Sequence, residues 1–251
     1  MSRGLGDVYK RQVGAGCGSY ELITLKGLSE IRRAEVIVYD DLIDEHLLEF
    51  APESCELIYA GKRSGRHSKA QEEINELLVE KALEGRYIVR LKGGDPYVFG
   101  RGGEEALALK VHGISVHEVP GVTSGIGLCG MAGIPVTHRG ASRGFHVITG
   151  HTADNLSPEV EEIRWKSYAK LDETFVFLMG LKSIDMITEK LMRYGKLSDT
   201  PVAVIHGENT DGTYVKLVGT LSDIAAKVKE VDFPSPAIIV VGEVASLELT
   251  D

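Results

Sequence analysis

The sequence has 251 residues, a formal net charge of -9 and three cysteines. A chain of this length forms one large domain or two ordinary ones without metal or disulfide support. Cys17, Cys55 and Cys129 form no C-x-x-C pair, which argues against a zinc site or a disulfide framework and favours a reducing cytosol. With no apolar run of about 18 residues and an acidic balance, neither a membrane nor a nucleic-acid partner is expected.

Short β-branched runs alternate with helical patterns along the chain, which is typical of a largely parallel sheet covered by helices and predicts an α/β fold. The first half predicts strands at 35–40, 87–92 and 115–119 and helices at 70–83 and 102–112. Pro120-Gly121 interrupts the pattern, so two α/β domains are predicted, residues 1–119 and 120–251. The second half predicts strands at 145–149, 174–179, 201–206 and 237–241 and helices at 184–194 and 222–229.

The start of the chain does not fit this pattern. A strand is expected to lead into Gly14-Ala15-Gly16, yet Asp7–Gln12 is polar and shows no apolar alternation. Residues 1–12 are therefore interpreted as a non-native leader in place of a strand. The glycines that follow suit a phosphate or dinucleotide, but Ser19 occupies the third glycine position of G-x-G-x-x-G. A dinucleotide-dependent oxidoreductase, with Asp40 as its ribose acid, stays open as an alternative.

The segment 91–104, L-K-G-G-D-P-Y-V-F-G-R-G-G-E, carries a more specific signal. A predicted strand ends in Gly93-Gly94, and glycines there leave room for a ligand at the carboxyl edge of the sheet. Asp95 is expected to project into that crevice. The alternative is that Asp95 caps the following turn, as Asp before Pro often does.

Two stretches without acidic residues stand out in this acidic protein. Residues 119–153 hold 35 positions without Asp or Glu, where even spreading predicts about five. The stretch is also rich in glycine, which suits a flat ligand or a closely packed helix. A second run, 57–71, contains Lys62, Arg63 and Arg66. Such runs favour a focused positive site for an anionic ligand, with solvated surface cations as the alternative.

At this point the sequence resembles the tetrapyrrole methylase family, from Val13 to about Leu247. The matching motifs are V-G-A-G at 13–16, I-T-L-K-G at 23–27, Y-D at 39–40, G-K-R at 61–63, Q-E-E-I-N at 71–75, R-L-K-G-G-D-P-Y-V-F-G-R-G-G-E-E at 90–105, V-P-G-V-T-S at 119–124, G-I-P-V-T-H-R at 133–139, T-G-H at 149–151 and M-G at 179–180. The G-K-R motif with His67 and Gln71 favours uroporphyrinogen III as substrate over ribosomal RNA or diphthamide.

The resemblance implies S-adenosylmethionine as the cofactor, with S-adenosylhomocysteine as its product, in a cleft between two domains, and no metal. The implied cofactor-binding residues are Cys17, Gly93, Gly94, Asp95, Val98, Thr123, Ser124, Met179 and Asn209. The chain departs from the family pattern at Cys17, Ser19 and Asn209, where proline, aspartate and glycine or alanine are usual. A cytoplasmic homodimer is also expected.

Asp40 and Lys62 match the family's proposed proton acceptor and donor. Transfer of a methyl group to an electron-rich pyrrole carbon leaves a cationic ring, which a carboxylate at a strand end would stabilise. The alternative role of Asp40 is helix capping beside Asp41. Substrate carboxylates are expected to meet Lys62 and the arginines Arg63, Arg66, Arg101 and Arg139, for which a plain surface role is the alternative.

The expected activity is therefore C-methylation of uroporphyrinogen III to precorrin-2 by way of precorrin-1, in sirohaem or cobalamin biosynthesis. Two further alternatives stay open: another precorrin methyltransferase of the same family, and a tetrapyrrole- or partner-binding protein that has lost cofactor affinity.

Overall fold

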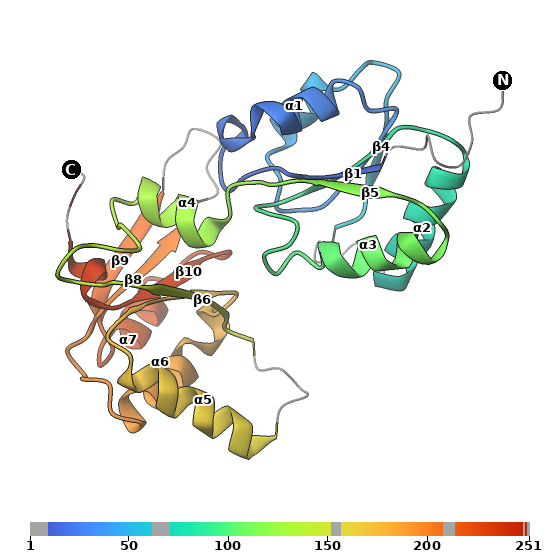
Figure 1. Ribbon diagram of the computed structural model, residues 1–251. Helices are drawn as coiled ribbons and strands as arrows, with labels where there is room; N and C mark the ends of the chain where they lie inside the picture. The colour runs from blue at the N-terminus through green and yellow to red at the C-terminus, as the bar shows by residue number, and fades with distance from the viewer. Residues whose placement is uncertain (1–9, 62–70, 152–156, 208–213, 248, 250–251) are drawn as a thin grey trace. The chain divides into compact units, whose positions relative to one another are not determined.

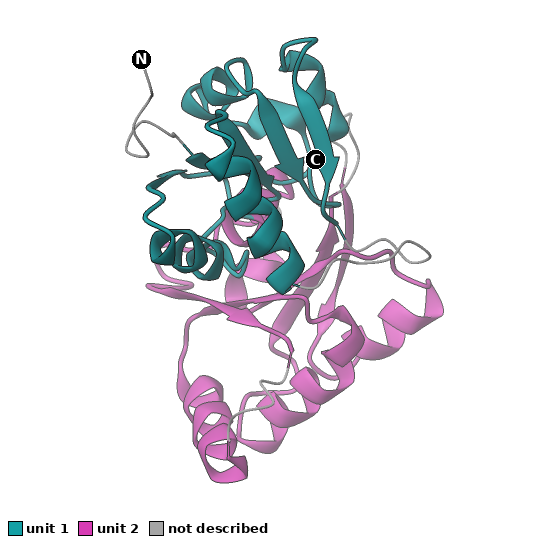
Figure 2. Cartoon of the chain, turned by 90° about the vertical axis from the view of Figure 1, so that its right-hand side faces the viewer, with its two compact units in different colours: residues 1–123 teal, residues 124–251 magenta. Residues whose placement is uncertain are grey.

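The computed structural model describes residues 10–61, 71–151, 157–207, 214–247 and 249. The chain divides into two compact units, residues 1–123 and 124–251, which Figure 2 distinguishes by colour. Both units combine a five-stranded sheet with helices, so the predicted α/β class is confirmed. Across the described ranges, no helix is long and apolar enough to cross a bilayer.

Unit 1 is built on a fully parallel sheet in the order β3-β2-β4-β1-β5 (Figure 1). Its strands are β1 (Lys10–Gly14), β2 (Val36–Tyr39), β3 (Glu56–Tyr59), β4 (Ile88–Lys92) and β5 (Val116–Val119). Its helices are α1 (Leu25–Ile31), α2 (Gln71–Leu83) and α3 (Gly102–Val111), with short 3-10 turns at Tyr20–Leu22 and Glu45–Phe50. Because all strands run the same way, their carboxyl ends share one edge of the sheet.

Alternation along these strands sends successive side chains to opposite faces, and each face has its own core. Val36, Val38 and Ile88 pack with residues of α2 and α3, whereas Ile37 and Val89 pack with residues of the α1 side. Figure 1 shows α1 on one face of the sheet and α2 and α3 on the other. Helices on both faces leave the carboxyl edge as the exposed place for a site.

The expectation that no strand forms within residues 1–12 is wrong for residues 10–12. These residues form β1, which pairs in parallel with β4 on one side and β5 on the other. Lys10 and Gln12 are fully buried in it. Backbone pairing on both edges sets the strand, and the side-chain nitrogen of Gln12 donates to the Gly102 carbonyl at 3.1 Å, so polar side chains did not exclude a central position.

Unit 2 has a mixed sheet in the order β6-β7-β10-β8-β9, in which only β6 and β7 pair in parallel. The expectation of a largely parallel sheet is therefore wrong for this half of the chain. Its strands are β6 (Phe145–Thr149), β7 (Thr174–Leu178), β8 (Pro201–His206), β9 (Val215–Thr220) and β10 (Ile238–Val241). Antiparallel strands β8 and β9 are close in sequence, and short connections favour antiparallel pairing.

Four helices complete unit 2: α4 (Ser124–Met131), α5 (Pro158–Lys170), α6 (Ile184–Arg193) and α7 (Ile224–Glu230), with 3-10 turns at Leu181–Ser183 and Glu243–Ser246. In Figure 1, α4 lies on one face of the sheet and α5, α6 and α7 on the other. Trp165, Phe175 and Phe177 lie in the core on the α5–α7 side, and their stacked ring pairs, Trp165–Phe177 and Phe175–Phe177, have centroids 6.2 and 6.3 Å apart.

Candidate active site

The carboxyl edge of the unit 1 sheet gathers several of the residues predicted to form the site. Asp40 follows β2, Gly93-Gly94-Asp95 follows β4, and Thr123 follows β5. Cys17 lies in the bend after β1 and is buried. Parallel pairing brings these four strand ends together although they are up to about a hundred positions apart in sequence. The edge is the candidate active site.

Three glycines at this edge touch one another through their backbones. A Cβ on Gly14 would lie 2.5 Å from the Cα of Gly121, and one on Gly121 would lie 2.1 Å from the carbonyl oxygen of Gly94. The amide of Gly94 donates to the Gly16 carbonyl at 2.7 Å. Gly14 and Gly121 are thus required by the packing of the β1, β4 and β5 loops, a reason independent of any ligand.

The two glycines after β4 have different surroundings. A Cβ on Gly93 would lie 2.4 Å from the Cβ of Leu42, so packing leaves no room for a side chain there. A Cβ on Gly94 would meet nothing closer than the Cα of Thr123, at 3.8 Å, and the φ of Gly94 is +67°. A side chain at Gly94 would therefore meet only an ordinary van der Waals contact, so the missing Cβ is not explained by packing and leaves room for a closely approaching ligand.

Asp95 ties two loops of the edge together. Its Oδ1 accepts from the Tyr97 amide at 2.9 Å and its Oδ2 from the Gly121 amide at 3.1 Å. The turn-capping role considered for Asp95 is therefore present, and it fixes the β4 loop to the β5 loop. Burial raises the pKa of the nearby Glu118, and the negative charge of Asp95 raises it further.

Left-handed backbone occurs at non-glycine residues of both units, including two residues beside the carboxyl edge of the unit 1 sheet. Phe99 has a φ of +55° and Arg101 one of +57°, in the loop that leads into α3. Arg101 is half-exposed and forms an ion pair with Glu104, whose Oε1 lies 3.0 Å from its Nε. In unit 2, Met179 has a φ of +56° and is 46 % exposed directly after β7. Such conformations cost about 1–3 kcal/mol each and cluster at functional sites.

Asp40 is held at the edge by three donors. Its Oδ1 accepts from the amide of Leu42 at 3.2 Å and from the amide of Gly93 at 3.4 Å. Its Oδ2 lies 3.4 Å from Nη2 of Arg90. The Asp40 side chain keeps 22 % of its surface exposed, so a carboxylate fixed from the sheet side still faces solvent.

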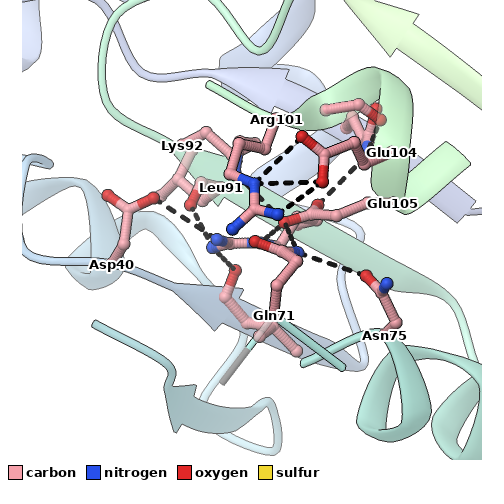
Figure 3. Close-up of polar contacts among 12 residues, drawn as sticks. Asp40, Gln71, Asn75, Leu91, Lys92, Arg101, Glu104 and Glu105 are labelled. Atoms are coloured by element: carbon pink, nitrogen blue, oxygen red, sulfur yellow. Dashed lines mark hydrogen bonds and ion pairs between the residues drawn. The ribbon is translucent and has the colours of Figure 1, made fainter. Parts of the chain in front are cut away.

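Behind Asp40 lies a buried charged cluster, which we define as Arg90, Lys92 and Glu105 (Figure 3). Glu105 Oε1 accepts from Arg90 Nε at 3.3 Å and from Lys92 Nζ at 3.2 Å. Burial acts to raise the pKa of Glu105, but the charges of Arg90 and Lys92 outweigh it, and the pKa lies below its ordinary value. Burial lowers the pKa of Lys92, and it lowers that of Lys10 well below the usual value.

This charged cluster was not predicted from the sequence. The sequence signal for it is that side chains alternate between the two faces of β4, so that Arg90 and Lys92 lie on the same face as the buried Ile88. Charged side chains that point inward from a central strand require buried partners. Glu105, three residues after the start of α3, is the acid that supplies them. In sequence it is indistinguishable from the exposed Glu104 beside it.

Several predicted residues lie elsewhere or outside the described part of the chain. Ser124 is the first residue of α4, and Arg139 is exposed in a turn between Gly133 and Ser142, both in unit 2. Val98 is half-buried, with its amide donating to the Asp95 carbonyl at 3.2 Å. The residues outside the described ranges are Lys62, Arg63, Arg66 and Asn209. Within those ranges, no group of three or more His, Cys, Asp or Glu side chains gathers for a metal ion.

The fold and the site define a class: a two-unit α/β protein with glycine turns and an anchored carboxylate at the carboxyl edge of a parallel sheet. Residues 12–225 match the model of the Tetrapyrrole (Corrin/Porphyrin) Methylases. The chain belongs to the tetrapyrrole methylase family.

Two curated relatives match this chain along nearly their whole lengths. The chain is 49% identical over 237 residues to a uroporphyrinogen-III C-methyltransferase of Methanocaldococcus jannaschii, covering 94% of this chain and 96% of the relative. It is 47% identical to a uroporphyrinogen-III C-methyltransferase of Priestia megaterium, covering 96% of this chain and 99% of the relative. The fold also matches a crystal structure of uroporphyrin-III C-methyl transferase from Thermus thermophilus complexed with S-adenyl homocysteine, with a TM-score of 0.78. The two sequences are 35% identical, and the match covers 95% of this chain and 93% of the solved chain.

Proposed function

We propose that the protein is an S-adenosylmethionine-dependent C-methyltransferase that converts uroporphyrinogen III to precorrin-2 by way of precorrin-1. The observation that carries the proposal is the contact between Asp40 and the amide of Gly93, 3.4 Å apart. It places the carboxylate expected to act on the substrate beside the glycine turn expected to bind the cofactor. The identity of nearly half of all aligned residues to the M. jannaschii enzyme supports the substrate assignment.

The residues present fit the cofactor. Gly94 offers backbone that no neighbouring side chain covers, and the strained, exposed Met179 is the kind of residue that ligand contacts retain. We assign to cofactor binding the residues Cys17, Gly93, Gly94, Asp95, Val98, Thr123, Ser124, Met179 and Asn209. When bound, the cofactor supplies a methyl group that its sulfonium has already activated.

The protein's own residues then have three tasks. The glycine turns hold their loops in fixed positions, so that the reactants are aligned in advance. The carboxylate of Asp40 stabilises the positive charge that develops on the methylated ring and accepts the proton that this ring loses, with Lys62 as the proton donor. The cations Lys62, Arg63, Arg66, Arg101 and Arg139 meet the carboxylates of the substrate.

Four finer assignments belong to the same proposal. The two domains are residues 1–119 and 120–251, the product enters sirohaem or cobalamin synthesis, the enzyme is a homodimer, and it works in the cytoplasm. The family resemblance supports the pathway and the assembly. Cys17, Cys55 and Cys129 are not joined in a disulfide, which supports a reducing compartment.

The test is anaerobic incubation of the protein with uroporphyrinogen III and S-adenosylmethionine, followed by mass spectrometry. The expected product carries two added methyl groups, with the singly methylated species as a transient. A protein that binds S-adenosylhomocysteine but adds no methyl group to uroporphyrinogen III, and methylates precorrin-2 instead, would be another precorrin methyltransferase. A protein that neither binds S-adenosylhomocysteine nor transfers a methyl group would be a non-catalytic tetrapyrrole-binding protein.

A further inference from the structure

We propose that Glu105 is a positioning residue for Asp40, acting through Arg90. The inference rests on the proposed function, in which the Asp40 carboxylate meets the substrate. Glu105 itself is fully buried in α3 and cannot reach a ligand. Its contribution must therefore pass through the groups that it holds.

Arg90 is the group that joins the two carboxylates. Its Nε donates to Glu105 at 3.3 Å, and its Nη1 lies 3.2 Å from the carbonyl oxygen of Val38 and 3.1 Å from that of Leu91. The remaining nitrogen, Nη2, points to Asp40 Oδ2 at 3.4 Å. Because a guanidinium is planar and rigid, fixing Nε and Nη1 also fixes the direction of Nη2.

Glu105 is in turn fixed from several elements. Besides Arg90 and Lys92 of β4, its Oε2 accepts from Gln12 of β1 at 3.1 Å, and its Oε1 accepts from Gln71 of α2 at 3.4 Å. Figure 3 shows Gln71, Lys92 and Glu105 converging behind Asp40. A carboxylate with four donors from two strands and a helix has little freedom to move. It is a stable reference point for the guanidinium.

Removing the charge of Glu105 would release this arrangement. Arg90 and Lys92 have side-chain exposures of 3 % and 6 %, so they would be left as buried cations without their shared acid. The nearest other carboxylate to Arg90 is Asp40 itself. We expect the guanidinium to turn toward Asp40 and to shift the oxygen that faces the substrate. Misplacement by about 1 Å can lower a rate about 10²-fold.

The test compares Glu105→Gln with Glu30→Gln. Glu30 is a matched control because it is also a buried helical carboxylate of unit 1, paired with Arg11 at 3.5 Å and hydrogen-bonded to Tyr87, but it contacts the opposite side of the sheet. Both variants should unfold at lower denaturant concentration. Only Glu105→Gln should lower turnover, by roughly 10- to 100-fold, with S-adenosylhomocysteine affinity within about twofold of the parent. Equal turnover in the two variants would overturn the proposal.

A double-mutant cycle separates positioning from general loss of structure. In an Asp40→Asn background, Glu105→Gln should lower the residual turnover by less than about twofold, because the residue through which it acts is already altered. The same fold-loss in both backgrounds would show that Glu105 acts independently of Asp40. If Glu105→Gln does not fold, Glu105→Asp, which keeps the charge but withdraws it by one methylene, replaces it in the cycle.

The two proposals fail in different ways. Normal turnover of Asp40→Asn would remove Asp40 from the catalytic mechanism and the positioning role with it. Suppose instead that Asp40→Asn greatly lowers turnover and that Glu105→Gln lowers turnover by the same factor with and without Asp40→Asn. The proposed function would then stand, and only the positioning role of Glu105 would be overturned.

Discussion

The two sheets of this protein use buried polarity in opposite ways. Among the described residues, every buried Lys, Arg and Glu lies in unit 1, whereas the buried polar residues of unit 2 are Ser142, Thr174, Thr188, Thr200 and His206. The core of unit 2 contains stacked aromatic rings, whereas the core of unit 1 contains the buried charged cluster. Buried ion clusters are poor stabilisers, so their presence in one sheet indicates that unit 1 uses them to orient groups at its edge.

The largest test of this contrast is Asp40→Asn. The substitution keeps the size and removes the charge, and groups of this type contribute about 10²–10⁴-fold. We expect turnover to fall by that amount while the denaturation midpoint and S-adenosylhomocysteine affinity stay near those of the parent. Steady-state kinetics with calorimetric titration measures both. Near-normal methyl transfer would mean that the unit 1 edge is scaffold only.

The opposite signature is expected in unit 2 from Phe175→Ala. Phe175 is fully buried and its ring stacks with those of His146 and Phe177, at centroid distances of 5.0 and 6.3 Å. Loss of such a ring costs about 3–5 kcal/mol of unfolding free energy. Urea denaturation should show this loss, whereas turnover per folded molecule should stay within about twofold of the parent. A catalytic defect without destabilisation would contradict the division of roles.

A smaller effect is expected from Gly94→Ala, with Gly113→Ala as its control. Both glycines have positive φ, +67° and +71°, and neither has a neighbour within 3.4 Å of the added Cβ, so both substitutions carry a similar backbone cost of about 1–2 kcal/mol. Only Gly94 lies at the carboxyl edge. Affinity for S-adenosylhomocysteine should fall roughly tenfold, about 1.4 kcal/mol, in Gly94→Ala alone. Equal affinities in the two variants would remove Gly94 from the cofactor site.

The smallest effect concerns salt. If the cations of the two acid-free stretches bind the substrate carboxylates, raising salt should weaken tetrapyrrole binding more than S-adenosylhomocysteine binding. Screening acts on exposed charges over a Debye length of about 10 Å at 0.1 M. Titrations of both ligands across a salt series give the two slopes, and parallel slopes would place the substrate's anionic groups away from these cations.

Sequence patterns predicted most of the apolar elements. β6 and β8 begin and end where the β-branched runs do, and α2 and α3 differ from their predicted ranges by one residue. Elements with weaker patterns were not predicted: the exposed edge strands β3 and β9, the polar α5, and α4, whose glycines disfavour a helix. β1 was excluded wrongly because its polar residues are buried by tertiary pairing, which local polarity does not reveal.

Some residues of the candidate site could also be predicted from the sequence, and others could not. Asp40 and Gly94 follow predicted strands, so parallel topology alone brings them to one edge. The glycines at 14 and 121 are explained by contacts between loops that are distant in sequence, and Glu105 by contacts with three other elements. Such roles depend on three-dimensional neighbours, which spacing along one chain does not encode.

The mutual contact of Gly14, Gly94 and Gly121 has a mechanical consequence. Backbones this close, with a hydrogen bond from Gly94 to Gly16 and another from Gly121 to Asp95, make the three loops a single rigid block. None of them can swing aside alone without breaking the others' contacts. A change in the conformation of any one of these loops must therefore involve the other two.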